Sequence, residues 1–231
     1  REFGLFDAII EQPVSKQALV KNRARKLGWP RVLSQIAFVT LIRPVLAYQS
    51  ARRIQSICRQ HDMERQQPFT PAIHRVENIN SQEALSLMAE RGPDVVIVNG
   101  TRILKKNVLS GIKATFINTH QGVTPMYRGA HGGYWALYNN DPANCGVTIH
   151  LVDEGIDTGG IIAQAMISPA AIDTYMSYPY LQIAAALPLL AMAIRAIATG
   201  DLKTLVRNGP SAVWYHPGFF QYIAARLRGV R

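Results

Sequence analysis

Short apolar runs alternate with amphipathic segments along this chain, and turn residues separate them. Runs typical of strands occupy 6–11, 72–76, 94–98, 114–120, 146–152 and 161–167. Helical periodicity occupies 15–26, 31–61, 82–91, 104–109, 134–138 and 173–198. This alternation predicts an α/β fold with an open, mainly parallel, Rossmann-like sheet flanked by helices.

Turn signals sharpen several of these boundaries. A Gly-Trp-Pro sequence at 28–30 interrupts the first two helices, and the polar, proline-containing run at 66–71 predicts a loop. The strand at 94–98 is apolar almost throughout, so we expect it to be covered on both faces of the sheet. The chain starts at Arg1 rather than at a methionine, and residues 6–11 already resemble a core strand. We therefore expect an upstream segment, with the first strand of the sheet, to be missing here.

Composition narrows the class of protein. Hydrophobic residues make up 48% of the 231 residues, which is enough for a core and argues against disorder. Cys58 and Cys145 are the only cysteines, which excludes a disulfide scaffold and argues against a structural zinc site. These features favour a reducing, cytoplasmic location.

The positive charge is concentrated in one part of the chain. Between Lys16 and Arg65 there are eleven Lys or Arg residues and two acids, whereas the whole chain carries a net charge of +10. Such a segment could meet a phosphorylated substrate, nucleic acid or an anionic membrane, or it could be a solvated helical face. Binding of single-stranded nucleic acid is not favoured, because no ladder of aromatic residues is interleaved with the charges.

Two apolar stretches, at 36–48 and 183–198, raise the question of a membrane. Each is shorter than the roughly 20 apolar residues that a span needs, and each contains a proline and an arginine. Buried core helices are the favoured interpretation. An interfacial helix stays open for the first stretch, because basic residues flank it.

Polar side chains gather at the end of the strand at 114–120. Asn118 and His120 are two residues apart, so they point to the same side, where ligands bind in open parallel sheets. An isolated pair of this kind is more often a satisfied polar pair. A loop with Tyr127-Arg128-Gly129 and His131 follows, and 146–152 then leads into an acidic, glycine-rich loop at 153–160.

These motifs, in this order, resemble the folate-dependent formyltransferases, which include glycinamide ribonucleotide transformylase, methionyl-tRNA formyltransferase and sugar-nucleotide N-formyltransferases. The resemblance covers 72–203 and rests on four pieces: Asn118-x-His120, Pro125-x-Tyr-Arg-Gly, Gly146-Val-Thr-x-His150 and Asp157-x-Gly-Gly. It implies a catalytic domain over 1–203 with a basic helical insertion at 14–71, followed by a C-terminal tail at 204–231.

The resemblance also implies roles for individual residues. Asn118 would bind the formyl oxygen, His120 would assist the oxyanion and proton traffic, and Asp157 would pair with His120 and transfer protons through water. His150 and His131 would support them. The co-substrate would be 10-formyltetrahydrofolate, with no metal. The residues expected against the folate are Arg102, Ile103, Leu104, Val152, Asp153 and Gly155.

The amine acceptor stays open among several classes. We expect a small phosphorylated or sugar-nucleotide amine, with glycinamide ribonucleotide or methionyl-tRNA as alternatives. A third alternative is a non-catalytic folate-binding or membrane-surface protein of the same fold. The family commonly has Pro-Ser after Asn-x-His, where this chain has Gln121-Gly122, so we expect a more flexible loop and a different amine.

Overall fold

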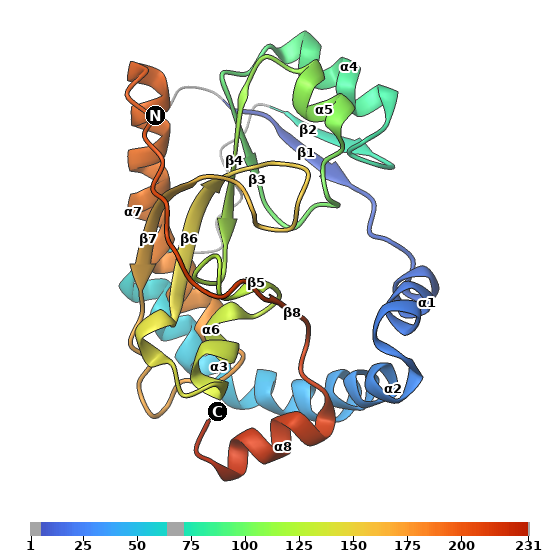
Figure 1. Ribbon diagram of the computed structural model, residues 1–231, viewed down its shortest axis with the longest axis vertical. Helices are drawn as coiled ribbons and strands as arrows, with labels where there is room; N and C mark the ends of the chain where they lie inside the picture. Colours follow the sequence, from blue (N-terminus) through green and yellow to red (C-terminus); the bar gives the residue numbers. More distant parts are fainter. Residues whose placement is uncertain (1–5, 64–71, 231) are drawn as a thin grey trace.

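A computed structural model describes residues 6–63 and 72–230 and has the expected α/β architecture (Figure 1). The predicted loop at 66–71 lies outside the described residues. The strands are β1 (Ala8–Glu11), β2 (Ile73–Val76), β3 (Val95–Val98), β4 (Thr115–His120), β5 (Arg128–Gly129), β6 (Gly146–Leu151), β7 (Ile161–Met166) and β8 (Val213–Trp214).

Most helices lie at the places that the periodicity predicts, whereas the helix at 219–227 and the short turn at 142–144 were not predicted. They are α1 (Lys16–Leu27), α2 (Trp29–Ala37), the wide π-helical turn η1 (Phe38–Ile42), α3 (Arg43–Gln60), α4 (Gln82–Arg91), α5 (Lys106–Gly111), α6 (Gly132–Tyr138), the short 3-10 turn η2 (Pro142–Asn144), α7 (Tyr178–Thr199) and α8 (Phe219–Leu227). Ser15 and Ser81 cap α1 and α4 through their hydroxyl groups, which fixes where both helices begin.

Strand pairing is parallel in one part of the fold and antiparallel in the other. β1 pairs with β2 and β3 pairs with β4 in parallel, as expected. The four-stranded sheet has the order β3-β4-β6-β7, and its β4–β6 and β6–β7 pairs are antiparallel. β1 and β2 form a separate two-stranded sheet, so β3 is an edge strand. The expectation that 94–98 is covered on both faces is therefore wrong, and Ile97 is 49% exposed.

The two apolar helices, which were expected to be buried core helices, bury one face each and leave other side chains exposed. α7 lies against β6 and β7 and buries Tyr178, Gln182, Ala186 and Ala193, whereas Leu187 and Met192 face outward. By length and composition, both 29–60 and 178–199 would be long and apolar enough to cross a membrane. Inward-facing residues hold each of them against the protein instead.

The segment expected as a tail, 204–231, packs against the domain as far as residue 230. β8 pairs with β5 in parallel, and the Trp214 ring stacks on Trp135 at 4.8 Å between centroids. In α8, Tyr222 and Ala225 are buried, and the Tyr222 ring lies 5.1 Å from that of Phe38. The last part of the chain thus covers the lower edge of the fold in Figure 1, where α8 packs beside α2 and η1.

The helices α1, α2, η1 and α3 form an arm, which we call the helical arm (residues 16–60). It is anchored to the body by a bidentate ion pair between Arg53 and Asp173, with nitrogen–oxygen distances of 2.8 and 3.1 Å. Ser50 adds a hydrogen bond to Thr174 at 2.7 Å. Arg53 and its neighbours on α3 therefore fix the arm against the turn that precedes α7.

Candidate active site

The carboxyl end of β4 brings together the first part of the site. Asn118 and His120 both contact Asp157, so they point to the same side of the sheet, as the two-residue repeat of a strand requires. β6 runs antiparallel beside β4 and pairs His150 directly with Asn118. A register shift between Ile149 and His150 interrupts the pairing with β7 at this point. Such irregularities re-aim side chains next to functional sites.

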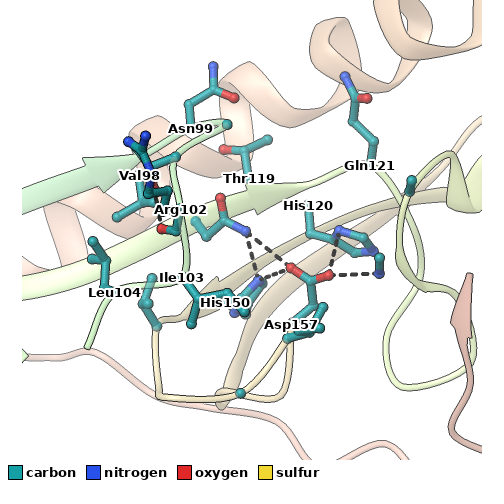
Figure 2. Close-up of a pocket in the computed structure, with 18 of the residues that line it drawn as sticks. Val98, Asn99, Arg102, Ile103, Leu104, Thr119, His120, Gln121, His150 and Asp157 are labelled. Carbon is teal, nitrogen blue, oxygen red and sulfur yellow. Dashed lines mark hydrogen bonds and ion pairs between the residues drawn. The ribbon is translucent and has the colours of Figure 1, made fainter. Parts of the chain in front are cut away.

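Asp157 joins these side chains from the glycine-rich loop after β6 (Figure 2). Its carboxylate lies 3.3 Å from Nδ1 of His120 and 3.6 Å from Nε2 of His150. It also accepts hydrogen bonds from the Asn118 amide at 3.4 Å and from the backbone N–H of Gly129 at 2.8 Å. One carboxylate therefore contacts an amide, two imidazoles and a backbone donor.

The backbone at Asp157 is in the left-handed region, with φ of 51°. Aspartate is one of the few residues that adopt this region readily, and such positions cluster at functional sites. Asp153 shapes the same loop by accepting hydrogen bonds from the N–H of Gly155 and the hydroxyl of Thr158 at 3.0 and 2.7 Å. The loop thus holds the Asp157 carboxylate over β4.

Neighbouring carbonyl groups fix the protons on the two imidazoles. Nε2 of His120 lies 2.6 Å from the carbonyl oxygen of Tyr127, so this nitrogen carries the proton and donates it. Nδ1 of His150 lies 2.6 Å from the carbonyl oxygen of Leu151 and donates in the same way. Nε2 of His150 then accepts from the Asn118 amide at 3.1 Å. The ring of His150 thereby orients Asn118.

Burial and neighbouring charges affect the pKa values of His120 and Asp157 in different ways. Burial lowers the pKa of His120 below its usual range, although the Asp157 charge opposes that shift. Burial would raise the pKa of Asp157, but its contacts with His150 and His120 and the hydrogen bond from the Gly129 N–H together lower it. Asp157 is therefore a carboxylate at neutral pH and can act as a proton acceptor.

The site opens into a pocket of about 410 Å³, within the size range of small-molecule sites. The structure brings all eleven residues that the sequence singled out to the wall of this one pocket. They are Asn118, His120, Asp157, His150, His131, Arg102, Ile103, Leu104, Val152, Asp153 and Gly155. Figure 2 shows Arg102, Ile103 and Leu104 on the opposite side of the pocket from His120.

The wall at 100–104 is held in place from behind. Glu11, at the end of β1, accepts hydrogen bonds from the backbone N–H of Arg102 at 2.6 Å and from its guanidinium group. Asn80 bonds the carbonyl of Ile103 at 3.1 Å and the N–H of Lys105 at 2.7 Å. The Arg102 guanidinium thus serves to fix this wall, and the backbone and the Ile103 side chain face the pocket.

A second cluster forms another corner of the pocket. His131, at a left-handed φ of 58°, lies 3.1 Å from His216, and the hydroxyl of Tyr175 lies 3.2 Å from the same His216 nitrogen. Burial lowers the pKa of His131 to about 3 and that of His216 to about 4, so both are neutral at neutral pH. His131 lies in this corner, where its ring contacts His216 and Tyr175.

Sequence reasoning did not single out His216. It reaches the pocket because β8 pairs with β5 and because the Gln35 amide of α2 donates to the His216 carbonyl at 2.7 Å. Both contacts join segments far apart in the chain. The His216-Pro217-Gly218 turn signal was the one local clue that this part of the tail has a fixed conformation.

The loop after His120 is tightly packed, contrary to the expectation of greater flexibility. Gly122, Val123 and Thr124 are buried, and the Thr124 N–H donates to the Thr148 hydroxyl at 3.1 Å. A Cβ atom at Gly122 would collide with the Tyr127 carbonyl and lie 2.6 Å from Nε2 of His120. Glycine is needed here because the loop folds back directly over His120.

The fold and the site together define an α/β enzyme-like domain in which a partly buried carboxylate lies between two histidines and an amide. The family model described as "Formyl transferase" matches residues 18–179, which is most of the chain. The chain therefore belongs to the formyl transferase family. The matched range includes most of the helical arm and Asn118, His120, His150 and Asp157.

Individual relatives agree with this assignment. The chain is 38% identical over 88 residues to methionyl-tRNA formyltransferase of Finegoldia magna, covering 38% of this chain and 28% of that protein. It is 32% identical over 123 residues to GDP-perosamine N-formyltransferase of Brucella melitensis, covering 53% of this chain and 47% of that protein. The chain thus spans less than half the length of either relative.

A solved structure supports the fold. The sugar N-formyltransferase of a Shewanella species superimposes with a TM-score of 0.53 at 17% identity, covering 78% of this chain and 83% of that chain. At this identity the likeness concerns the fold alone.

Proposed function

We propose that this protein is a folate-dependent N-formyltransferase that moves a formyl group from 10-formyltetrahydrofolate to an amine. The observation that carries the proposal is the position of Asp157, whose carboxylate contacts His120, His150 and Asn118 at the wall of a pocket. Membership of the formyl transferase family supports the type of reaction.

The reaction needs a stabilised oxyanion and a path for one proton. The amine nitrogen attacks the formyl carbon, a carbon–nitrogen bond forms, and the carbonyl oxygen becomes an oxyanion. Collapse of this intermediate breaks the bond to N10 of the folate. The proton that the amine loses ends on that nitrogen, so charge and atoms balance.

Asn118 is the residue that we assign to the oxyanion. An amide N–H that is held before the reaction begins typically contributes about 3–4 kcal/mol to such a transition state. In the free structure its amide hydrogens point to His150 and Asp157, at 3.1 and 3.4 Å. One of these bonds must therefore be exchanged for the formyl oxygen when the donor binds. His150 acts as a positioning residue that holds the amide near this geometry.

Asp157 and His120 are the residues that we assign to proton transfer. The carboxylate is ionised at neutral pH and accepts the proton of the amine through a water molecule. Such general-base assistance is commonly worth about a hundred- to ten-thousand-fold in rate. Both nitrogens of His120 face other groups, at 2.6 Å from Tyr127 and 3.3 Å from Asp157. Because the proton lies on Nε2, His120 can donate it to the oxyanion only if the contact with Tyr127 opens.

The ends of the pocket suggest where each substrate lies. We place the pterin of the folate against 100–104, with Val152, Asp153 and Gly155 beside it, because these residues line one part of the wall. The amine then approaches from the His131–His216 corner. Burial is the main cause of the lowered pKa of His216, and the positive charges of Arg23 and Arg43 lower it further. A phosphorylated or sugar-nucleotide amine fits this cationic corner.

A second acceptor class has its own support. The relative from Finegoldia magna is a methionyl-tRNA formyltransferase, so an amine carried by RNA is the alternative acceptor. The charge of the helical arm would suit either. We further infer a cytoplasmic location, in line with the free thiols of Cys58 and Cys145.

The test offers 10-formyltetrahydrofolate to the protein with a panel of amines: a sugar nucleotide, glycinamide ribonucleotide and methionyl-tRNA. Release of tetrahydrofolate that depends on one amine supports the proposal and names the acceptor. Folate binding without release for every amine contradicts the catalytic assignment and favours a non-catalytic folate-binding protein. The variant His120→Ala, which should bind folate without turnover, serves as the control.

A further inference from the structure

The outer face of the helical arm is apolar and exposed. α2, η1 and α3 run as one continuous helix from residue 29 to 60, and its inner face buries Val32, Phe38, Leu46 and Ile57. The opposite face carries six large side chains that are each between 38% and 87% exposed. They are Trp29, Leu33, Ile36, Leu41, Val45 and Tyr48, which we call the exposed stripe.

The wide turn η1 keeps these side chains in one line. The spacing along the stripe is four and three residues before η1 and again after it, as on one face of an α-helix. Between Ile36 and Leu41 the spacing is five, and the π-helical turn at Phe38–Ile42 accommodates the extra residue. The stripe therefore extends over 29–48, about 28 Å at 1.5 Å per residue.

The charge around the stripe is of one sign. Residues 16–60 contain ten Lys or Arg side chains and no Asp or Glu. Lys16 and Lys21 of α1 line a surface groove together with Val20 and Trp29, at one end of the stripe. Arg31 and Arg52 are exposed along the same helix. Cationic side chains thus lie at one end of the stripe and elsewhere along the same helix.

The combination of exposed apolar surface and positive charge favours one kind of binding partner over others. An apolar face of this length is larger than isolated surface leucines and indicates a partner. A symmetric contact with a second copy would bring two sets of ten positive charges together without acids from either arm. An anionic bilayer offers both an apolar interior for the stripe and negative headgroups for the lysines and arginines.

We propose that the exposed stripe docks the protein on an anionic phospholipid bilayer, with the helix at 29–60 lying in the plane of the interface. The helix lies in this plane rather than across the bilayer because its inner face packs on the protein through Val32, Phe38, Leu46 and Ile57. This docking is independent of the formyl transfer, because the residues of the stripe do not line the catalytic pocket.

The experiment is co-sedimentation of the full chain with sonicated vesicles of phosphatidylcholine, with and without one quarter phosphatidylglycerol. The expected result is partition onto the anionic vesicles at least about tenfold above that onto neutral ones, falling as salt is raised. The double variant Leu33→Glu/Leu41→Glu should lower this partition at least about tenfold, because it places two carboxylates in the stripe.

A matched control places the same charges on another exposed apolar face. Leu187→Glu/Met192→Glu lies on α7, where both side chains are about as exposed as Ile36, and it should leave the partition unchanged. Circular dichroism should show the same helix content for both variants. Equal binding by both double variants, or no binding of the unchanged protein, would overturn the proposal. A dimer in light scattering that Leu33→Glu/Leu41→Glu converts to a monomer would assign the face to a second copy instead.

Discussion

The catalytic pocket and the helical arm differ in how their polar and charged side chains are paired. In the pocket, Asp157 lies within 3.6 Å of three side chains, and each histidine beside it has a hydrogen-bond partner on its other ring nitrogen. In the arm, ten cationic side chains lie in a segment without a single acid, and the apolar stripe faces outward.

This difference separates groups that act within the protein from groups that act on something outside it. A buried polar network is stable only when its members satisfy one another, so its geometry is set by the fold itself. A segment that contains only positive charges beside exposed apolar surface has no such internal explanation, although Arg53 pairs with Asp173 of the body. The comparison therefore divides the molecule into a self-contained reaction centre and an outward-facing arm.

The strongest test of the reaction centre is Asp157→Asn. Asparagine tolerates the left-handed backbone at this position, so the fold should persist. Loss of the negative charge removes the general base, and we expect kcat to fall about a hundred- to ten-thousand-fold. Steady-state release of tetrahydrofolate measures it. Asp201→Asn, which changes an exposed acid after α7, is the matched control and should keep its rate. Equal rates for the two variants would mean that the carboxylate has no catalytic role.

The next test concerns the anchor of the arm. Arg53→Ala leaves the carboxylate of Asp173, whose side chain is fully buried, without its bidentate partner. We expect the free energy of unfolding in urea to fall by about 3 kcal/mol. Arg52→Ala, one residue away and exposed, should change it by less than about 0.5 kcal/mol. If both variants behave alike, the arm is held by apolar packing alone.

A smaller effect is expected at Gly122, where the loop presses on His120. Gly122→Ala introduces a Cβ that collides with the Tyr127 carbonyl, and we expect a loss of about 1–3 kcal/mol in the free energy of unfolding. Gly111→Ala is the control, because its Cβ would meet only the flexible end of Leu85 at 3.1 Å. An unchanged stability for Gly122→Ala would show that this loop is looser than the contacts indicate.

The smallest effect concerns pH. Burial lowers the pKa of His131 to about 3 and of His216 to about 4, below the ordinary 6.5 of the unfolded chain. The unfolded state therefore takes up protons first, and stability falls as the pH drops from 6.5 toward 4. Each histidine contributes at most about 1.4 kcal/mol per pH unit.

His131→Asn should flatten this dependence, since asparagine also accepts the left-handed backbone. The free energy of unfolding at pH 7 and pH 5 measures the slope for each variant. The control replaces the exposed His61 by asparagine and should keep the original slope. The same slope in all three proteins would show that the His131–His216 corner is open to water.

Much of the fold could be predicted because local patterns encode local elements. Gln82–Arg91 begins and ends where the serine cap and the glycine stop predict, and β4 and β6 match their apolar runs to within a residue. The direction of β6 and β7 could not be predicted, because the apolar pattern of a strand does not depend on its direction. The exposed face of Ile97 was missed for a related reason, since pattern alone does not reveal an edge strand.

The residues of the candidate site also divide into those that the sequence predicted and those that it missed. The two-residue repeat predicted that Asn118 and His120 share a side, and the resemblance to a family brought in Asp157 and His150. His216 was missed because it reaches the pocket only through tertiary contacts with β5 and α2. The exposed stripe was missed because the apolar stretch at 36–48 is also what a buried helix would show.

The central claim is that the Asp157 network transfers a formyl group, and one measurement tests it most directly. The protein is mixed with 10-formyltetrahydrofolate labelled with carbon-13 in the formyl group and with the amine selected from the panel. The account predicts that the label moves to the amine in a single turnover with the unchanged protein, and at least about a hundredfold more slowly with Asp157→Asn. Label that stays on the folate, or that moves equally fast in both proteins, would contradict it.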